Sequence, residues 1–498
     1  MSTTSTVTAG TIDQVIQQIQ RDNKRLTSRP RRISPIVFAG LIRISEFALL
    51  GITGIAIASA WVGTQDAFQD TRYLAAILVT ALVSVVAAHR FELYAVPAIL
   101  APLRSLPRVG MAWTTAMAVF VGAIFLLKAG LDFSRAWLTI WYIAGFATLG
   151  VFRYGASLML QQWAAQGRLN RRAVVYGAGP EGEAVIKALE GDGASDIQIC
   201  GVFDDRGDDR IINAGTGRRV GNIEELIAFC RTEPVDLLIV SLPITAEKRL
   251  LSLLNKLWVL PVDIRLAAHT NKVRFRPRAY SFVGSVPLLD IFDKPLADWD
   301  TLVKGVFDKM VATAAIIALA PVMALVALAV KLDSKGPVLF RQKRLGFNNE
   351  LIDVFKFRSM YTDMADANAS KLVTKSDPRV TRVGRFIRRT SLDELPQLFN
   401  VLLGTLSLVG PRPHALMAKA ADQLYHDVVD GYFARHKVKP GITGWAQVNG
   451  WRGETDTPEK IQKRVEHDLY YIENWSLFLD VYILLMTPVS LLKSENAY

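Results

Sequence analysis

Two adjacent carboxylates, Asp393 and Glu394, follow a dense run of arginines. The arginines are Arg379, Arg382, Arg385, Arg388 and Arg389. A short apolar helix is expected after the acids, from Pro396 to Leu403, with Gly404 ending it. Carboxylates beside cations at a helix start suit phosphate chemistry, because the helix end favours anions and keeps a carboxylate ionised. An ionised Asp can attack phosphorus, and a neighbouring acid can hold a divalent metal.

The same stretch has a purely structural alternative. Ser391-x-x-Glu394 matches a helix capping box, in which both side chains would only stabilise the helix start. That register puts Pro396 at the fifth helical position, where it would lose an intrahelical hydrogen bond. If Asp393 caps the helix instead, Pro396 falls in the first turn and loses nothing. The stretch by itself leaves both the catalytic and the structural interpretation open.

Two cations further upstream lie on a predicted strand. The stretch from Ile352 to Arg358 reads as a strand that pairs with an earlier one, from Pro337 to Gln342. Lys356 and Arg358 alternate to the same face of this strand, since side chains two residues apart point the same way. They could contact a phosphate group, or they could simply be exposed charges on a sheet.

Two polar side chains stand on turns rich in glycine and proline. Arg412 is presented by the rigid turn from Ser407 to Pro413. Gln447 lies in a glycine-rich loop, from Lys437 to Gly450, that could close over a nucleotide. The candidates for substrate binding are therefore Lys356, Arg358, Arg379, Arg388, Arg412 and Gln447.

Composition bounds the class of protein. A chain of 498 residues is long enough for two or three domains. A hydrophobic content of 51% with a mean hydropathy of +0.23 indicates membrane segments. The net charge of +12 suits an anionic membrane face or phosphorylated substrates, and no nucleic-acid-binding motif is present, so nucleic acid is not an expected partner. The only cysteines, Cys200 and Cys230, suggest a reducing compartment.

The N-terminal third reads as a membrane bundle. Residues 1–35 form a polar, basic tail, which we expect to be cytoplasmic and uncleaved. Candidate spans follow near 36–60, 73–89, 109–128 and 136–160. Basic residues gather in the loop at 90–108 and after the fourth span, which places both ends of the bundle inside. Within the first span Arg43 and Glu46 could pair, and a packing role is favoured over a functional one.

A soluble α/β stretch comes next. Gly177-x-Gly179-x-x-Gly182 follows one predicted strand and opens a helix, and a second strand ends at Asp204 and Asp205. This context fits a dinucleotide-binding fingerprint. No catalytic Tyr-x-x-x-Lys accompanies it, so a Rossmann-like module kept for regulation or assembly is the alternative. Residues 262–300, punctuated by proline and arginine, read as a linker.

A different membrane element is expected after the linker. The stretch from Val311 to Val330 is apolar throughout, yet Pro321 sits at its centre and lysines flank both ends. Equal charge on both sides gives no change of side under the positive-inside rule. A re-entrant helix–break–helix that enters and leaves the same face satisfies these features. The final apolar run, from Leu477 to Leu492, contains Asp480 and is expected to be an interfacial helix.

Several motifs from about residue 303 onward resemble the bacterial sugar transferase family, the polyprenyl-phosphate glycosyl-1-phosphate transferases. The matching stretches are Lys331–Ser334, Phe340–Gln342, Phe355–Met360, Asp377–Arg379, Thr390–Gln397, Ser407–Pro413 and Lys439–Asn449. The whole chain is similar to the large monotopic members that initiate exopolysaccharide repeat units, most of all to undecaprenyl-phosphate glucose phosphotransferases.

The resemblance implies transfer of a sugar 1-phosphate, glucose 1-phosphate in the first place, from a UDP-sugar to undecaprenyl phosphate with release of UMP. It implies that Asp393 is the nucleophile, that Glu394 is associated with Mg²⁺ and that Arg412 contacts the nucleotide. A re-entrant helix with a central proline, here Pro321, is also a family trait. One departure is visible, because Thr405 stands where many members carry Asp, so that position receives no role.

The expected fold is a membrane protein with a four-helix transmembrane bundle, a Rossmann-like middle domain and a monotopic α/β catalytic domain with a re-entrant helix. The expected domains are 1–35, 36–165, 170–300 and 301–498, with the re-entrant helix near 303–331. We expect a homodimer in the bacterial inner membrane with its soluble domains in the cytoplasm. The alternatives are a membrane-tethered NAD-dependent sugar-nucleotide oxidoreductase or dehydratase, and a non-catalytic scaffold for polysaccharide assembly.

Overall fold

The computed structural model describes most of the chain. The described residues are 33–61, 71–129, 132–191, 197–205, 219–242, 246–267, 281–283, 286–362, 377–414, 419–420, 423–424, 429, 431–453 and 457–493. The chain divides into two compact units. One is Pro30–Asn170, and the other includes Arg171–Tyr498.

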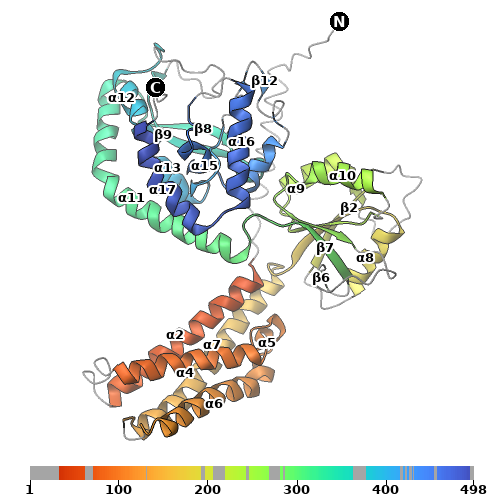
Figure 1. Cartoon of the computed structure of the whole chain (residues 1–498), viewed down its shortest axis with the longest axis vertical. Helices are drawn as coiled ribbons and strands as arrows, with labels where there is room; N and C mark the ends of the chain where they lie inside the picture. The colour runs from red at the N-terminus through yellow and green to blue at the C-terminus, as the bar shows by residue number, and fades with distance from the viewer. Residues whose placement is uncertain are drawn as a thin grey trace. The chain divides into compact units, whose positions relative to one another are not determined.

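Unit Pro30–Asn170 is built from apolar helices. They are α2 (Pro35–Trp61), α4 (Thr71–Arg90), α5 (Val96–Leu100), α6 (Pro102–Leu126) and α7 (Arg135–Ala165). The long helices lie side by side, α2 against α4 and α7, and α6 against the same two (Figure 1). The predicted spans overlap these helices, each of which is long and apolar enough to cross a bilayer. Several apolar helices near the N-terminus thus mark a membrane protein.

Buried indole rings fill the centre of this unit. Trp113, Trp137 and Trp141 are fully buried, and the rings of Trp137 and Trp141 stack with centroids 5.1 Å apart. The indole N–H of Trp137 donates to the carbonyl of Gly54 at 3.1 Å. A Cβ at Gly54 would lie 2.9 Å from the Trp141 ring, so only glycine lets α2 approach α7 this closely. Large rings with satisfied N–H groups therefore set the spacing of the bundle.

A buried ion pair joins α2 to α7. Arg153 Nε lies 2.7 Å from Glu46 Oε1, and Tyr94 donates its hydroxyl to Glu46 at 2.8 Å. The predicted pairing of Arg43 with Glu46 is wrong, since Arg43 instead lies 3.4 Å from His89 Nδ1. Arg153 comes from a helix distant in sequence, which i,i+3 spacing could not reveal. The contact ties elements together, as a packing role requires.

The middle part of the second unit is a mixed sheet. Its strands are β1 (Arg171–Tyr176), β2 (Ile197–Phe203), β3 (Arg219–Gly221), β4 (Leu237–Val240), β5 (Asp263–Ala267), β6 (Ser281–Val283) and β7 (Val286–Phe292), in the order β3-β2-β1-β4-β5-β7-β6. The first five run parallel, and β7 joins β5 and β6 antiparallel. Parallel order 3-2-1-4-5 is typical of doubly wound α/β sheets.

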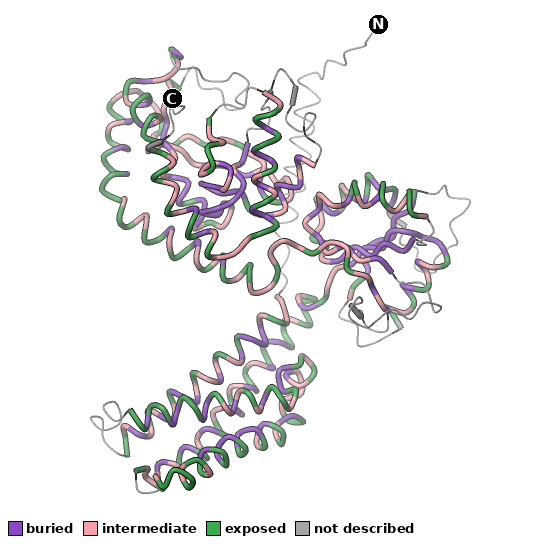
Figure 2. The backbone as a smooth tube through the Cα atoms, in the orientation of Figure 1, coloured by how far each residue is buried: buried purple, intermediate pink, exposed green. Residues whose placement is uncertain are grey.

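Helices cover both faces of this sheet. They are α8 (Pro180–Gly191), α9 (Ile223–Thr232) and α10 (Glu247–Leu257). Leu226 and Leu257 of α9 and α10 belong to one apolar cluster, and Ile186 of α8 belongs to another. The central strands are buried while the outer helix faces are exposed (Figure 2). The strands accordingly read as continuous apolar runs rather than alternating ones.

The prediction of a linker over 262–300 is wrong, because β5, β6 and β7 lie in that range and complete the sheet. The residues that suggested a linker, Arg274, Arg276, Pro277 and Arg278, lie outside the described residues. Other charges in the range form ion pairs. Arg265 Nε lies 2.7 Å from Asp290, and Arg265 Nη2 lies 2.6 Å from Asp293. Leu288, on β7 between β5 and β6, is fully buried.

The C-terminal part combines helices with short strands. Its elements are α11 (Asp298–Asp333), β8 (Leu339–Leu345), η3 (Phe347–Asn349), β9 (Leu351–Phe357), α12 (Arg382–Arg389), η5 (Leu392–Glu394), α13 (Gln397–Leu403), β10 (Ser407–Val409), β11 (Lys419–Ala420), β12 (Gln423–Leu424), η6 (Tyr432–Lys437), β13 (Gly441–Thr443), α15 (Trp445–Val448), α16 (Pro458–Glu473) and α17 (Leu477–Lys493). The predicted hairpin is confirmed as β8–β9. The main apolar core of the C-terminal part includes Val354, Leu398 and Leu408.

Helix α11 is continuous, with Pro321 inside it. The predicted break is therefore absent, although the helix curves along its length (Figure 1). A proline removes one hydrogen bond and bends a helix without having to end it. Large apolar side chains remain exposed along the helix, including Ile317, Leu325 and Leu332. Such a surface suits lipid rather than water.

Both ends of α11 are bonded to the same C-terminal part. At the N-terminal end Lys304 Nζ lies 2.6 Å from Asp480 of α17, and Asp308 accepts the Ser407 hydroxyl at 2.7 Å. At the other end Asp333 accepts the backbone N–H of Val383, at the start of α12, at 3.1 Å. Both ends of α11 therefore contact the same C-terminal part.

Helix α17 has one buried side. Asp480 and Ile483 are fully buried, whereas Phe478 is 88% exposed and Leu485 is 70% exposed. The apolar exposed side fits the interfacial helix that the sequence predicts.

Candidate active site

The two acids occupy a tight turn between α12 and α13. Ser391, just before them, has a left-handed backbone with φ 57°, and η5 (Leu392–Glu394) follows. The Ser391 side chain makes no capping contact and instead accepts a hydrogen bond from Arg452 at 2.7 Å. Helix α13 begins only at Gln397, with no side-chain cap. The capping-box alternative is therefore wrong.

Glu394 is held by two cations. Lys356 donates to its Oε1 at 3.0 Å, and Arg412 donates to the same oxygen. Burial would raise the pKa of Glu394, but Arg412 and Lys356 outweigh it and hold that pKa well below its usual range. Glu394 is consequently ionised at all physiological pH values.

Asp393 has the opposite surroundings. It is 8% exposed, and within the described residues its carboxylate accepts no hydrogen bond. Burial raises the pKa of Asp393 to about 6, against the lowering effect of Lys356 and Arg388. The group is thus ionised at neutral pH and unusually basic for an aspartate. A carboxylate without hydrogen-bond donors is available to attack an electrophile.

Two arginines near the pair were missed by sequence analysis. The charges of Arg344 and Arg452 act on both Asp393 and Glu394. Burial, followed by the charge of Arg412, lowers the pKa of Arg344 to about 10, so it remains a cation at neutral pH. Strand alternation could have found Arg344, because it lies on the same face of the β8–β9 hairpin as Lys356. For Arg452, just past the glycine-rich loop, the sequence offered no comparable signal.

The remaining predicted residues fall in different places. Arg388 lies close enough to lower the pKa of both Asp393 and Asp377. Arg379 pairs with Asp377 at 2.6 Å and lowers its pKa to about 2. Gln447, on α15, has a buried amide oxygen without a hydrogen-bond partner among the described residues. The substrate-binding roles of all three stay predictions.

Arg358 lies apart from Lys356. Its Nη2 donates to the carbonyl of Ser334 at 2.6 Å and to that of Val330 at 3.3 Å, at the C-terminal end of α11. The shared face that alternation predicted does not extend this far, because β9 ends at Phe357. Arg358 therefore caps a helix in this structure, where its positive charge complements the helix dipole.

Close backbone packing positions Arg412. The turn that carries it follows β10, which pairs in parallel with β13. A Cβ at Gly444 would lie 2.3 Å from the carbonyl oxygen of Gly410, so glycine is required for the two loops to touch. Arg412 Nη1 also donates to the carbonyl of Ile442 at 3.2 Å. These contacts direct the guanidinium at Glu394.

Asp393 and Glu394 are the acids that could hold Mg²⁺ here. No cluster of three or more His, Cys, Asp or Glu suited to a metal occurs among the described residues. Mg²⁺ typically binds through one or two carboxylates together with substrate phosphates. Both cations contact Oε1 of Glu394, and Oε2 accepts no hydrogen bond within the described part of the chain. The pair fits a Mg²⁺ that also binds a diphosphate.

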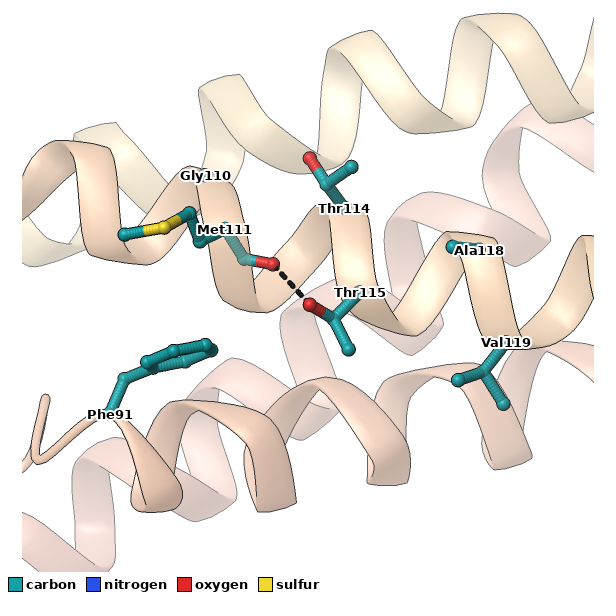
Figure 3. A pocket seen from close by; sticks show the side chains of 7 residues that line it. All are labelled: Phe91, Gly110, Met111, Thr114, Thr115, Ala118 and Val119. Carbon is teal, nitrogen blue, oxygen red and sulfur yellow. Dashed lines mark hydrogen bonds between the residues drawn. The ribbon is translucent and has the colours of Figure 1, made fainter.

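A separate groove lies in unit Pro30–Asn170. Phe91 faces residues of α6 across it, among them Met111, Thr115 and Val119 (Figure 3). Its lining has no ionisable side chain, and the Thr115 hydroxyl already donates to the carbonyl of Met111 at 2.7 Å. The groove offers packing surface rather than chemistry.

Comparison with known proteins agrees with this arrangement. Residues 299–494 match the family described as bacterial sugar transferase, and residues 89–268 match a CoA-binding domain. A UDP-glucose:undecaprenyl-phosphate glucose-1-phosphate transferase of Xanthomonas campestris pv. campestris is 33% identical over 95% of this chain and 98% of its own length. The protein of the same name from Escherichia coli K12 is 36% identical over 73% of this chain and 76% of its own.

A third relative matches less of its own length. The undecaprenyl-phosphate glucose phosphotransferase of Komagataeibacter xylinus is 42% identical over 66% of this chain and 61% of that protein. The family match together with the apolar helices indicates a membrane-associated transferase. This chain belongs to the bacterial sugar transferase family, and it is an enzyme.

Proposed function

We propose that this protein transfers glucose 1-phosphate from UDP-glucose to undecaprenyl phosphate and releases UMP. The observation that carries the proposal is the contrast within the pair: Asp393 has no hydrogen-bond donor among the described residues, while Lys356 and Arg412 hold Glu394. One carboxylate is free to react, and its neighbour is fixed as an anion. The names of the relatives support the choice of substrates.

The reaction would proceed in two displacements. A carboxylate oxygen of Asp393 attacks the phosphorus that bears the sugar, and the bond from this phosphorus to the bridging oxygen breaks, so UMP leaves. A phosphate oxygen of undecaprenyl phosphate then attacks the same phosphorus and displaces Asp393. The product is undecaprenyl diphosphate glucose. A covalent phosphosugar–aspartate intermediate means that the two anionic substrates need not occupy the site together.

The cations around the pair would stabilise the charge of both displacements. The cations outnumber the two carboxylates, so the site has a net positive charge that would attract a diphosphate. These cations are Lys356, Arg412, Arg344, Arg452 and Arg388. Bound Mg²⁺, held by Glu394, would neutralise part of the diphosphate charge. Arg379 and Gln447 would complete the substrate contacts.

The membrane arrangement follows from the helices. We propose that α2, α4, α6 and α7 span the bacterial inner membrane and that α11 is re-entrant, with the soluble parts in the cytoplasm where UDP-sugars occur. The anchoring of both α11 ends to one folded part supports this arrangement. Cysteines introduced near residues 300 and 345 should both be labelled from the cytoplasmic side. Labelling from opposite sides would contradict the re-entrant arrangement.

The proposed biological setting is the first step of exopolysaccharide or capsule repeat-unit assembly. A relative from Rhizobium leguminosarum bv. phaseoli, 49% identical over 38% of this chain, is named an exopolysaccharide production protein. A homodimer is also proposed, and the mass of the detergent-solubilised protein by light scattering tests it.

The deciding experiment is UMP release. Purified protein is incubated with undecaprenyl phosphate, Mg²⁺ and one UDP-sugar at a time, with UDP-glucose, UDP-galactose and UDP-N-acetylgalactosamine compared. We expect the highest rate with UDP-glucose. Because a relative from Aeromonas hydrophila is named an N-acetylgalactosaminephosphotransferase, the third arm tests the sugar directly. Nicotinamide reduction without UMP release would favour the oxidoreductase alternative, and neither activity would favour a scaffold.

A further inference from the structure

Segment η6 (Tyr432–Lys437) carries a buried arginine that supports the active site. Arg435 Nη2 donates to the backbone carbonyl of Arg412 at 2.7 Å and to Asp468 of α16 at 2.6 Å. The side chains of both ion-pair members are almost inaccessible, 0% exposed for Arg435 and 2% for Asp468. The backbone at Arg412, whose side chain contacts Glu394, is therefore held in place by the Arg435 side chain of η6.

The opposite side of η6 touches the middle part of the same unit. The guanidinium of Arg231, on the last turn of α9, lies 5.2 Å from the centroid of the Phe433 ring. Lys437 Nζ lies 5.5 Å from the centroid of the ring of Trp258, which ends α10. Gly431, directly before η6, packs so closely that a Cβ would lie 2.2 Å from that ring. Cation–aromatic contacts of this kind are specific in geometry as well as attractive.

A second contact joins the same surface to the β8–β9 hairpin. Asn348 Nδ2 donates to the carbonyls of Cys230 and Arg231, at 3.0 and 3.3 Å, where α9 ends. Asn348 has a left-handed backbone, φ 52°, and its neighbour Asn349 contacts His436 of η6. The strands that leave this turn carry Arg344 and Lys356. The ends of α9 and α10 thus touch both segments that place cations around Glu394.

We propose that the end of α9 and α10, defined by Arg231 and Trp258, is a positioning surface for the active site. It holds η6 and the hairpin turn, and through them it fixes Arg412 and Lys356 on Glu394. Arg231, Trp258 and Asn348 are positioning residues, because they act through Arg412 and Lys356 and do not touch substrate. The role rests on the proposed function. In this role the middle part of the unit supports the active site through protein contacts alone and needs no bound ligand.

The test compares variants of the full chain by UMP release. Trp258→Ala and Asn348→Gly should each lower kcat/KM for UDP-glucose by about tenfold or more, since displacing a site group by an ångström is that costly. The glycine keeps the left-handed backbone of position 348 and removes only the donor. Trp258→Phe, which keeps an aromatic face for Lys437, should restore most of the activity. Lys248→Ala, an exposed cation on α10, is the matched control and should behave as the unsubstituted chain.

Dependence on Arg412 separates positioning from general loss of structure. In an Arg412→Ala background, Trp258→Ala should lower kcat/KM no further, because its route to the site is already gone. An equal loss in both backgrounds, or folded Trp258→Ala and Asn348→Gly proteins with unchanged kcat/KM, would overturn the positioning role. If the unsubstituted chain itself releases no UMP, it is the proposed function that fails.

Discussion

Two regions of this protein carry sequence features suited to phosphate, and only one has them chemically available. Asp204, which follows β2, accepts the backbone N–H of Ala178 in the glycine loop after β1, at 2.8 Å. Asp205 accepts the hydroxyl of Tyr176 at 2.7 Å and the N–H of Ile223 at 2.9 Å. In the turn before α13, by contrast, Asp393 accepts no hydrogen bond among the described residues. A carboxylate in a motif can react only if the fold does not already occupy it with hydrogen bonds.

The two regions also differ in the sign of their surroundings. Asp204, 1% exposed, puts a buried carboxylate next to the loop that would receive a diphosphate, and Arg249 lies 3.6 Å from it. A Cβ at Gly182 would lie 1.9 Å from the carbonyl oxygen of Gly177, so this glycine is needed for helix–loop packing whether or not a ligand binds. Around Asp393 and Glu394 cations are in excess. The comparison predicts that disturbing the two regions has unequal consequences.

The largest effect is expected from Asp393→Asn. The change keeps the size of the side chain and removes the charge that attacks phosphorus, so UMP release and covalent labelling from a radiolabelled UDP-sugar should fall by at least about a thousandfold. Because burial raises the pKa of Asp393 to about 6, its ionisation opposes folding, and this cost grows as the pH rises from about 4 to about 6 and then stays constant. The variant should therefore be more stable at pH 7.5 by about 2–3 kcal/mol, and no more stable near pH 4.

Asp353→Asn is the control, since Asp353 is a half-exposed carboxylate on β9, 3.6 Å from Lys343. It should leave both activity and melting temperature nearly unchanged. A fully active Asp393→Asn protein would eliminate the proposed mechanism.

Glu394→Gln should have the next largest effect. It removes the anion on which Lys356 and Arg412 converge, so both cations lose their partner while the nucleophile stays. We expect UMP release to fall by about ten- to a hundredfold, with part of the loss recovered at higher Mg²⁺ concentration. Rates measured across a Mg²⁺ titration decide the matter. A loss that no Mg²⁺ concentration relieves would argue against a metal-binding role for Glu394.

A smaller, graded effect is expected from pH. The raised pKa of Asp393, about 6, means that the carboxylate is ionised above that pH and protonated below it. The rate should be level near neutrality and fall by about tenfold for each pH unit below 6, since only the ionised form attacks. Ionisation of Glu394 should not change the rate in this pH range, because its pKa is held well below the usual value. A profile that stays flat down to pH 4.5 would contradict the assignment.

The smallest effect on activity is expected from Asp204→Asn. Losing the carboxylate weakens the hydrogen bond to Ala178, so the middle part should lose about 1–3 kcal/mol of stability. UMP release should change by less than about threefold while the fold holds. Calorimetric titration of the unsubstituted protein with NAD⁺ or coenzyme A should give no binding. A dissociation constant below about 100 µM for either would overturn the conclusion that this loop is occupied internally.

Local patterns in the sequence predicted the elements well. Long apolar runs placed the N-terminal helices, and alternation placed the β8–β9 hairpin. Period and composition act over a few residues, so they are readable in one dimension. The same patterns failed where partners are distant. Glu46 forms its ion pair with Arg153 of another helix. Asp290 forms its ion pair with Arg265 across a sheet, where a linker was predicted.

The candidate site divides in the same way. Asp393, Glu394 and Arg412 came from short motifs, and the structure brings them together. Arg435 and Asp468 carry no local signal, since nothing near either residue reveals that they meet in the interior. Arg358 was misplaced because strand alternation says nothing about where a strand ends. Contacts between distant segments depend on the complete fold, which no short pattern encodes.

The bond between Lys304 and Asp480 has a consequence for how the protein is made. These residues are 176 positions apart and join the first helix of the C-terminal part to its last. At a synthesis rate of about 5–20 residues per second, Lys304 leaves the ribosome roughly 9–35 seconds before its partner exists. Until then the nearest carboxylate to Lys304 is that of Asp308, 3.9 Å away on the same helix. The contact can form only after Asp480 has been synthesised, so this part of the fold cannot be completed before then.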